Sequence, residues 1–177
     1  MSKSQICVGV VFGGVSNEHN VSIRSAKTVV NALSNGLNST RFEIVCIYID
    51  QKGRWWNYKI ASKALIKGIA LEDKELSLQN LSTGFTNLPK ESTKVDIWFP
   101  VLHGPNGEDG SIQGFFKLIG KPFVGSGVLG SALGMDKLAM KAAFKAAGLP
   151  QTAFESAESP QIRDPDSLEQ LINRLEQ

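Results

Sequence analysis

A short apolar stretch near the start of the chain decides the fold: Ile6-Cys7-Val8-Gly9-Val10-Val11-Phe12, closed by Gly13-Gly14. Short apolar runs rich in β-branched residues are typical of strands buried on both faces, as in a parallel sheet. A helix is expected next, with Ser22 as its N-cap, an end at Asn35-Gly36, and an apolar face of Ile23, Ala26, Val30 and Leu33. Residues 42–49 form a second apolar run, so the sequence predicts a β-α-β unit.

The middle of the chain continues this alternation less regularly. Trp55-Trp56 predicts a short edge strand, and the polar, weakly periodic residues 63–93 indicate a variable surface segment. Residues 95–102 form the next apolar strand, with Pro100 near its end. A helix over 111–119 and a short strand over 122–124 are expected to follow.

Beyond residue 127 the pattern becomes helical. Asp136 suits the cap of a helix over 137–147, residues 152–156 predict a strand, and Asp164-Pro165 predicts the start of a last helix. That helix has an apolar face with little chain left to cover it: Leu168, Leu171, Ile172 and Leu175. We therefore expect a complete α/β domain with a mostly parallel sheet over residues 1–127, and an unfinished second domain over 128–177.

Composition narrows the class of protein. The formal net charge of +2 is small and the basic residues are scattered, which argues against a nucleic-acid partner. Cys7 and Cys46 lie singly in apolar runs, so we expect buried thiols rather than a disulfide framework or a zinc site. The first apolar run passes directly into Gly13-Gly14 without a cleavage pattern, and no stretch has the length of a membrane span. We expect a cytoplasmic protein.

Two glycine-containing loops are candidate binding elements, because both leave the carboxyl ends of predicted strands. In the first, residues 12–22, Glu18 is either a charge at a helix start or a carboxylate that holds a small cation such as an ammonium group. In the second, residues 103–110, His103 precedes three glycines and two acids. This loop is either a binding loop or a turn in which Asp109 or Ser111 caps the next helix. Because both loops leave the carboxyl ends of strands, we expect them to converge on one crevice, which would be a small-ligand site.

A third candidate is Met135-Asp136-Lys137 at the start of a predicted helix. The simpler interpretation is a cap followed by a solvated lysine. The alternative is a lysine that reaches a nucleotide phosphate.

Together the three stretches resemble the D-alanine–D-alanine ligases, a family of ATP-grasp enzymes. The first resembling motif is Phe12-Gly13-Gly14, Ser16, Glu18-His19 and Val21-Ser22. The second runs from Phe99 through His103-Gly104-Pro105 and Gly107-Glu108-Asp109-Gly110-Ser111 to Gly114, and the third is Gly125-Ser126-Gly127-Val128, Ser131-Ala132 and Met135-Asp136-Lys137. The resemblance implies a Rossmann-like pre-ATP-grasp domain followed by the incomplete start of an ATP-grasp domain.

The resemblance also implies residue roles. Glu18 would hold the ammonium group of the first D-alanine with His103 nearby, both as catalytic-site residues, and Val21, Ser22 and Gly104 would complete the substrate pocket. Lys137 would contact the ATP phosphates. Mg²⁺ or Mn²⁺ would serve the complete enzyme, whose metal ligands this chain does not contain. Full-length members are expected to be homodimers that make peptidoglycan precursors.

Members of the family are considerably longer and carry most of their catalytic groups beyond the length of this chain. We therefore expect an N-terminal part that is inactive alone. A D-alanine–D-lactate ligase fragment remains an alternative, as does a non-catalytic module that retains only the small-ligand pocket.

Overall fold

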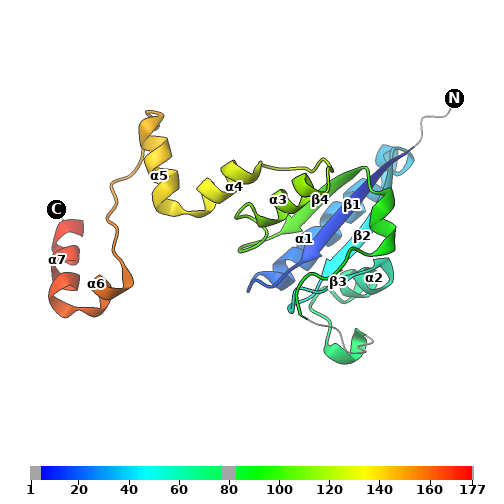
Figure 1. Cartoon of the computed structure of the whole chain (residues 1–177), viewed down its shortest axis with the longest axis horizontal. Helices are drawn as coiled ribbons and strands as arrows, with labels where there is room; N and C mark the ends of the chain where they lie inside the picture. The colour runs from blue at the N-terminus through cyan, green and yellow to red at the C-terminus, as the bar shows by residue number, and fades with distance from the viewer. Residues whose placement is uncertain (1–4, 77–82, 177) are drawn as a thin grey trace. The chain divides into compact units, whose positions relative to one another are not determined.

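A computed structural model describes residues 5–76 and 83–176 and shows an α/β fold with a mostly parallel sheet, as the sequence predicts. The strands are β1 (Ile6–Gly13), β2 (Phe42–Ile49), β3 (Trp55–Trp56) and β4 (Ile97–Leu102). Their order is β3-β2-β1-β4, and β1 is parallel to both β2 and β4 while β3 is antiparallel to β2 (Figure 1). The carboxyl ends of β1, β2 and β4 therefore share one edge of the sheet.

Helices α1 (His19–Ser34), α2 (Tyr58–Lys67) and α3 (Ser111–Leu118) pack on this sheet. The further helices along the chain are α4 (Val128–Met135), α5 (Lys137–Ala146), α6 (Ser159–Arg163) and α7 (Pro165–Leu175). Short 3-10 helices are η1 (Gly36–Thr40), η2 (Asp73–Glu75) and η3 (Lys90–Lys94). None of the helices in the described part of the chain is long and apolar enough to cross a membrane.

Successive side chains of β1 point to opposite faces of the sheet, and both faces are covered by helices. Val10 and Phe12 pack with residues of α1 and α2. Cys7 and Val11 pack on the other face with Phe116 of α3. The expectation of a doubly buried β1 is confirmed, and so is the burial of Cys7 and Cys46, both of which are free thiols.

The chain divides into two compact units, Met1–Ala132 and Leu133–Gln177. In the second unit, the Asp136 carboxylate accepts hydrogen bonds from the backbone N–H groups of Leu138 and Ala139 at 3.0 and 2.9 Å, which starts α5. The Asp164 carboxylate likewise accepts from Ser167 N–H at 3.0 Å, with Pro165 at the first position of α7. Both predicted caps are confirmed.

The prediction that Ser22 caps the first helix is wrong. Helix α1 begins at His19, so Ser22 lies in its first turn and is fully buried. Helix α2 was not expected either. Asn57 caps it by accepting from Ile60 N–H at 3.3 Å, and its buried face consists of Ile60, Ala61 and Ala64. The expected surface segment over 63–93 thus begins inside a helix and contains buried side chains such as Leu71; residues 77–82 of it lie outside the described residues.

Two predicted strands do not form as such. Residues 122–124 make only a single parallel bridge, between Phe123 and Trp98. Residues 152–156 are extended but belong to no strand, because no strand among residues 5–76 and 83–176 pairs with them. Residues 152–156 are exposed, so water can form hydrogen bonds with their backbone N–H and C=O groups.

Candidate functional site

The two glycine-containing loops lie against each other where β1 and β4 end. The Ser16 hydroxyl donates a hydrogen bond to the carbonyl oxygen of His103 at 2.6 Å and accepts one from the backbone N–H of Glu18 at 3.1 Å. Adjacent parallel strands bring their carboxyl ends together, which is where open α/β sheets bind ligands. The expected convergence of the two loops is confirmed.

The turn after β1 needs its glycines. Gly13 and Gly14 have φ values of 97° and 92°, a region that side-chain-bearing residues rarely adopt. A Cβ atom on Gly13 would lie 2.0 Å from the Ile49 carbonyl oxygen, which also accepts the Gly14 N–H at 2.8 Å. The turn therefore brings the start of the loop into contact with the last residue of β2.

Glu18 is exposed and precedes the first residue of α1. Its carboxylate lies beside Gly104, which has a φ of 74°. A Cβ atom on Gly104 would lie 3.1 Å from Glu18 Oε2 and 3.2 Å from Ser16 Cβ. Because Gly104 has no side chain, the Glu18 carboxylate can lie close to its backbone.

The remaining predicted substrate residues differ in exposure. His103 is half-buried with its Nε2 atom 3.3 Å from the Ser25 hydroxyl, and Val21 is exposed on the first turn of α1. Ser22 is fully buried: its hydroxyl accepts from Gly13 N–H at 2.8 Å and donates to the carbonyl oxygen of Val101. The Ser22 hydroxyl therefore joins β1, α1 and β4.

The two acids of the second loop serve the loop itself. The Glu108 carboxylate accepts the Gly104 N–H at 2.7 Å. The Asp109 carboxylate accepts from Asn106 N–H at 2.8 Å and from Ser111 N–H at 3.0 Å. Partial burial opposes ionisation of Asp109, but these backbone donors outweigh it and hold its pKa below the ordinary value. The carboxylate of Asp109 therefore stabilises the turn, as expected of a structural loop. The N-cap of α3 is Gly110 and has no side-chain cap, so the prediction that Asp109 or Ser111 caps this helix is wrong.

A cavity of about 340 Å³ opens at the same edge of the sheet, next to His103. Much of its wall is aromatic: the rings of Trp55 and Phe85 are 5.4 Å apart, and those of Phe85 and Phe115 are 5.0 Å apart. The sequence analysis did not assign these aromatic residues to the site, because they come from three distant segments and form no local pattern.

Lys137 belongs to the second unit, where its Nζ atom donates to the Gly134 carbonyl oxygen at 3.0 Å and remains exposed. An exposed ammonium group suits a phosphate. Among the side chains that the structure describes, no group of three or more His, Cys, Asp or Glu residues is placed to hold a metal ion.

The fold is an α/β domain with a mostly parallel sheet, and its two glycine-containing loops meet at the carboxyl edge of that sheet. Residues 7–126 match the family model described as D-ala D-ala ligase N-terminus. The chain therefore belongs to the D-alanine–D-alanine ligase N-terminal domain family, which confirms the resemblance found in the three motifs.

Individual relatives agree with this assignment. A D-alanine–D-alanine ligase of Prochlorococcus marinus (strain MIT 9303) is 56% identical over 176 residues, which are 99% of this chain and 50% of the relative. A ligase of the same name from Synechococcus sp. (strain CC9311) is 54% identical over 176 residues, again 99% of this chain and 50% of the relative. The chain spans about half the length of the curated relatives it matches.

Solved structures show the same fold. The D-alanine-D-alanine ligase from Coxiella burnetii matches with a TM-score of 0.70 and 29% identity, covering 98% of this chain and 50% of that one. The VanG D-Ala:D-Ser ligase from Enterococcus faecalis matches with a TM-score of 0.63 and 30% identity, covering 98% and 49%.

Proposed function

We propose that this chain supplies the first-substrate site of an ATP-dependent D-alanine–D-alanine ligase. The observation that carries the proposal is the Ser16 hydroxyl, which joins the Glu18 loop to the His103 strand end through bonds of 3.1 and 2.6 Å. The exposed carboxylate of Glu18 and the half-buried His103 are thereby held on loops that contact each other. The substrate is inferred from the names of the relatives, and the side chains of Glu18 and His103 are chemically suited to bind it.

D-Alanine carries an ammonium and a carboxylate on one small carbon centre. The Glu18 carboxylate suits the ammonium group, because charge-assisted hydrogen bonds are the stronger kind. His103 lies on the neighbouring loop as the second polar group, and Val21 and Gly104 are the further substrate residues that the family resemblance implies. Ser22 has no exposed surface, so we assign it a positioning role in place of the direct contact implied by the resemblance.

The proposed overall reaction joins two D-alanine molecules. ATP transfers its γ-phosphoryl group to a carboxylate oxygen of the first, forming an acyl phosphate and ADP. The amine of the second D-alanine, having lost a proton, attacks the acyl carbon and phosphate leaves with the C–O bond electrons. This chain would contribute the site for the first D-alanine and, through Lys137, a contact to the ATP phosphates.

The wider assignments are part of the same proposal. Residues 1–127 would form the pre-ATP-grasp domain and residues 128–177 the start of the ATP-grasp domain. The described residues do not provide a Mg²⁺ or Mn²⁺ site, so we derive no step through the metal. The complete enzyme would be a cytoplasmic homodimer in peptidoglycan precursor synthesis.

The proposal is tested by titrating the purified chain with D-alanine, L-alanine and D-lactate while recording backbone amide spectra. We expect D-alanine to shift the amide signals of residues 14–18 and 103–104. D-Lactate, which has a hydroxyl group in place of the ammonium, should bind at least tenfold more weakly, because roughly 1.5–3 kcal/mol of charge-assisted bonding is lost. Equal responses to D-alanine and D-lactate would exclude an ammonium site at Glu18.

A further inference from the structure

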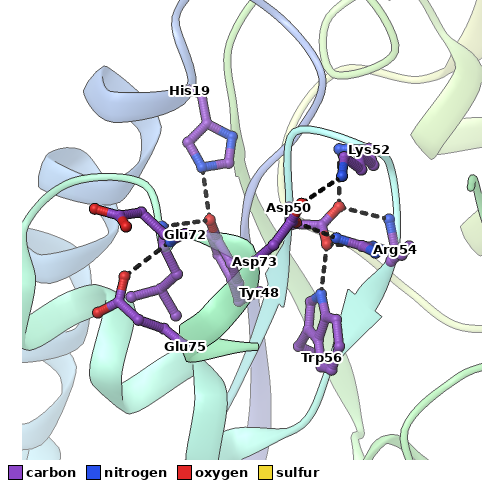
Figure 2. A network of polar contacts seen from close by, with 10 residues as sticks. His19, Tyr48, Asp50, Lys52, Arg54, Trp56, Glu72, Asp73 and Glu75 are labelled. Atoms are coloured by element: carbon purple, nitrogen blue, oxygen red, sulfur yellow. Dashed lines mark hydrogen bonds and ion pairs between the residues drawn. The ribbon is translucent and has the colours of Figure 1, made fainter. Parts of the chain in front are cut away.

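A buried line of polar contacts runs from the β1–α1 turn through β2 to residue 71. His19 is 1% exposed and Tyr48 is fully buried. The His19 Nδ1 atom lies 2.5 Å from the Gly14 carbonyl oxygen, and its Nε2 atom lies 2.9 Å from the Tyr48 hydroxyl (Figure 2). The Tyr48 hydroxyl in turn accepts the backbone N–H of Leu71 at 3.4 Å. Neither His19 nor Tyr48 was a candidate site residue in the sequence analysis.

Which atom donates in each of these hydrogen bonds follows from the partners at the two ends of the line and from the burial of the His19 ring. The Gly14 carbonyl oxygen can only accept, so His19 Nδ1 carries the proton. The Leu71 N–H can only donate, so the Tyr48 hydroxyl oxygen accepts there. Burial disfavours the charged imidazolium form of His19, so its Nε2 atom carries no proton and accepts the proton of the Tyr48 hydroxyl. The His19 ring is therefore neutral, with the Nδ1–H tautomer, and both of its nitrogen atoms are satisfied.

The surroundings favour neutral rings. Burial lowers the pKa of His19, and it outweighs the opposing effects of the Gly14 contact and of the Asp50 charge. Burial also raises the pKa of Tyr48 to about 12. Asp50 itself is occupied by Arg54 Nε at 2.6 Å and Trp56 Nε1 at 2.8 Å (Figure 2). Glu75, whose charge also acts on Tyr48, is paired with Lys67 at 2.6 Å. Both carboxylates near the two rings are thus bonded to other residues.

The far end of the line is anchored as well. Ala70 N–H donates to Asn20 Oδ1 at 2.8 Å, next to His19 on α1. Asp73 pairs with Lys52 at 2.7 Å and with Arg54 at 3.3 Å, which ties η2 to the β2–β3 turn (Figure 2). Leu71 is therefore held on both sides, and its N–H group presents a fixed donor to Tyr48.

We propose that His19 and Tyr48 are positioning residues that hold the Gly14 carbonyl group, and through it the loop that carries Ser16 and Glu18, in the conformation that receives the first substrate. This role rests on the proposed function of Glu18. Glu18 follows Gly14 by four positions, and the peptide plane of Gly14 sets the direction in which the loop leaves β1. The buried His19 ring fixes that plane through its contact with the Gly14 carbonyl oxygen.

The chain is well suited to a direct test, because it contains only two histidines and two tyrosines. Tyr48→Phe removes the hydroxyl group and keeps the ring, while Tyr58→Phe is the matched control at an exposed residue of α2. With ¹⁵N-labelled histidine, and a His103→Gln variant to assign the signals, the tautomer of His19 can be observed directly. Backbone amide exchange reports on the loop.

We expect wild type and Tyr58→Phe to show the Nδ1–H tautomer of His19. In Tyr48→Phe the ring should keep the Nδ1–H tautomer, because the Gly14 carbonyl oxygen can still only accept, but the Nε2 signal should shift because that atom loses its hydrogen-bond donor. Amide exchange should accelerate in residues 14–18 more than in β1 and β2, and the dissociation constant for D-alanine should rise roughly three- to tenfold.

Unchanged His19 signals in Tyr48→Phe, or acceleration of exchange spread evenly over the sheet, would overturn the positioning role. So would equal D-alanine affinity of Tyr48→Phe and wild type. If the wild-type chain bound no D-alanine, the proposed function would fail by that result alone, and the ring and exchange measurements would still decide whether the line of contacts holds the loop.

Discussion

Ser16 and His103 lie 87 positions apart in the chain and are joined by a hydrogen bond of 2.6 Å from the Ser16 hydroxyl to the His103 carbonyl oxygen. The same hydroxyl accepts the N–H of Glu18. One side chain therefore sets the distance between the two loops of the candidate site.

Replacing Ser16 with alanine should weaken D-alanine binding more than it weakens the fold. Removing one net hydrogen bond costs about 1 kcal/mol, so affinity should fall roughly fivefold. Ser39→Ala is the control, because it also removes a hydroxyl-to-carbonyl bond, to Gly36 at 2.7 Å, in a surface turn. Calorimetric titration and urea unfolding of both variants check this. A similar affinity for Ser16→Ala and Ser39→Ala would contradict the bridging role.

Gly104→Ala should disturb both the backbone and the Glu18 carboxylate. The left-handed conformation costs a residue with a Cβ atom about 1–2 kcal/mol, and the new methyl group would meet Glu18 Oε2 at 3.1 Å. Gly120→Ala carries a similar backbone cost at a φ of 67°, but it meets no atom within 4 Å. Both variants should lose stability in urea unfolding, while only Gly104→Ala should lose D-alanine affinity. Loss of affinity in both would mean that the contact with Glu18 is irrelevant.

The lowered pKa of His19 makes stability depend on pH in a defined window. The unfolded chain takes up a proton near pH 6.5 whereas the folded chain resists it, so stability is complete above that pH and falls as pH decreases below it. Carboxylates with lowered pKa values, such as Asp109 and Asp164, lose their contribution only below their ordinary value of 3.8. Urea midpoints of wild type should therefore fall between about pH 6.5 and pH 5.

His19→Asn is the informative variant for this window, because its amide can still donate to the Gly14 carbonyl group and cannot titrate. We expect lower stability overall and a flatter pH dependence above pH 5. The same slope in His19→Asn and wild type would assign the pH dependence to other groups.

Neither cysteine should react in the folded chain. Burial raises the pKa of the Cys46 thiol to about 12 and also raises that of Cys7, where the charges of Glu43 and Asp96 add to the effect. At pH 8 roughly one Cys46 thiol in ten thousand is ionised, and the thiolate is the reactive form. A thiol reagent should label both residues only after urea is added. Rapid labelling of the native chain would contradict their burial.

The sequence predicts those parts of the fold that depend on local apolar patterns. β1 is a continuous apolar run and β2 is apolar except for Glu43, and the burial of β1 from Cys7 onward and of β2 from Val45 onward agrees with this pattern. Helix α2 escaped prediction because two of its three buried residues, Ala61 and Ala64, are small and give a weak periodic signal. Residues 122–124 have the composition of a strand and pair with Trp98, but the pairing ends after one bridge, and sequence patterns do not reveal how far a pairing extends.

The candidate site, too, could be predicted from the sequence only in part. Glycines, a carboxylate and a histidine after predicted strands indicate the two loops, and the parallel sheet then requires them to meet. The partners of these residues depend on tertiary contacts. His19 meets Tyr48 from 29 positions away, and Ser22 reaches Val101 across 79. Ser22 was therefore mistaken for a cap, and Tyr48 was not recognised at all.

The most direct test of the account is the affinity of the purified chain for D-alanine before and after Glu18→Gln. Glu169→Gln, at an exposed position of α7, is the matched control. We predict that Glu18→Gln lowers the affinity roughly tenfold to a hundredfold, because a charge-assisted bond to the ammonium group is lost, and that Glu169→Gln has no effect. Equal affinity of Glu18→Gln and wild type would contradict the central claim that this carboxylate holds the first substrate.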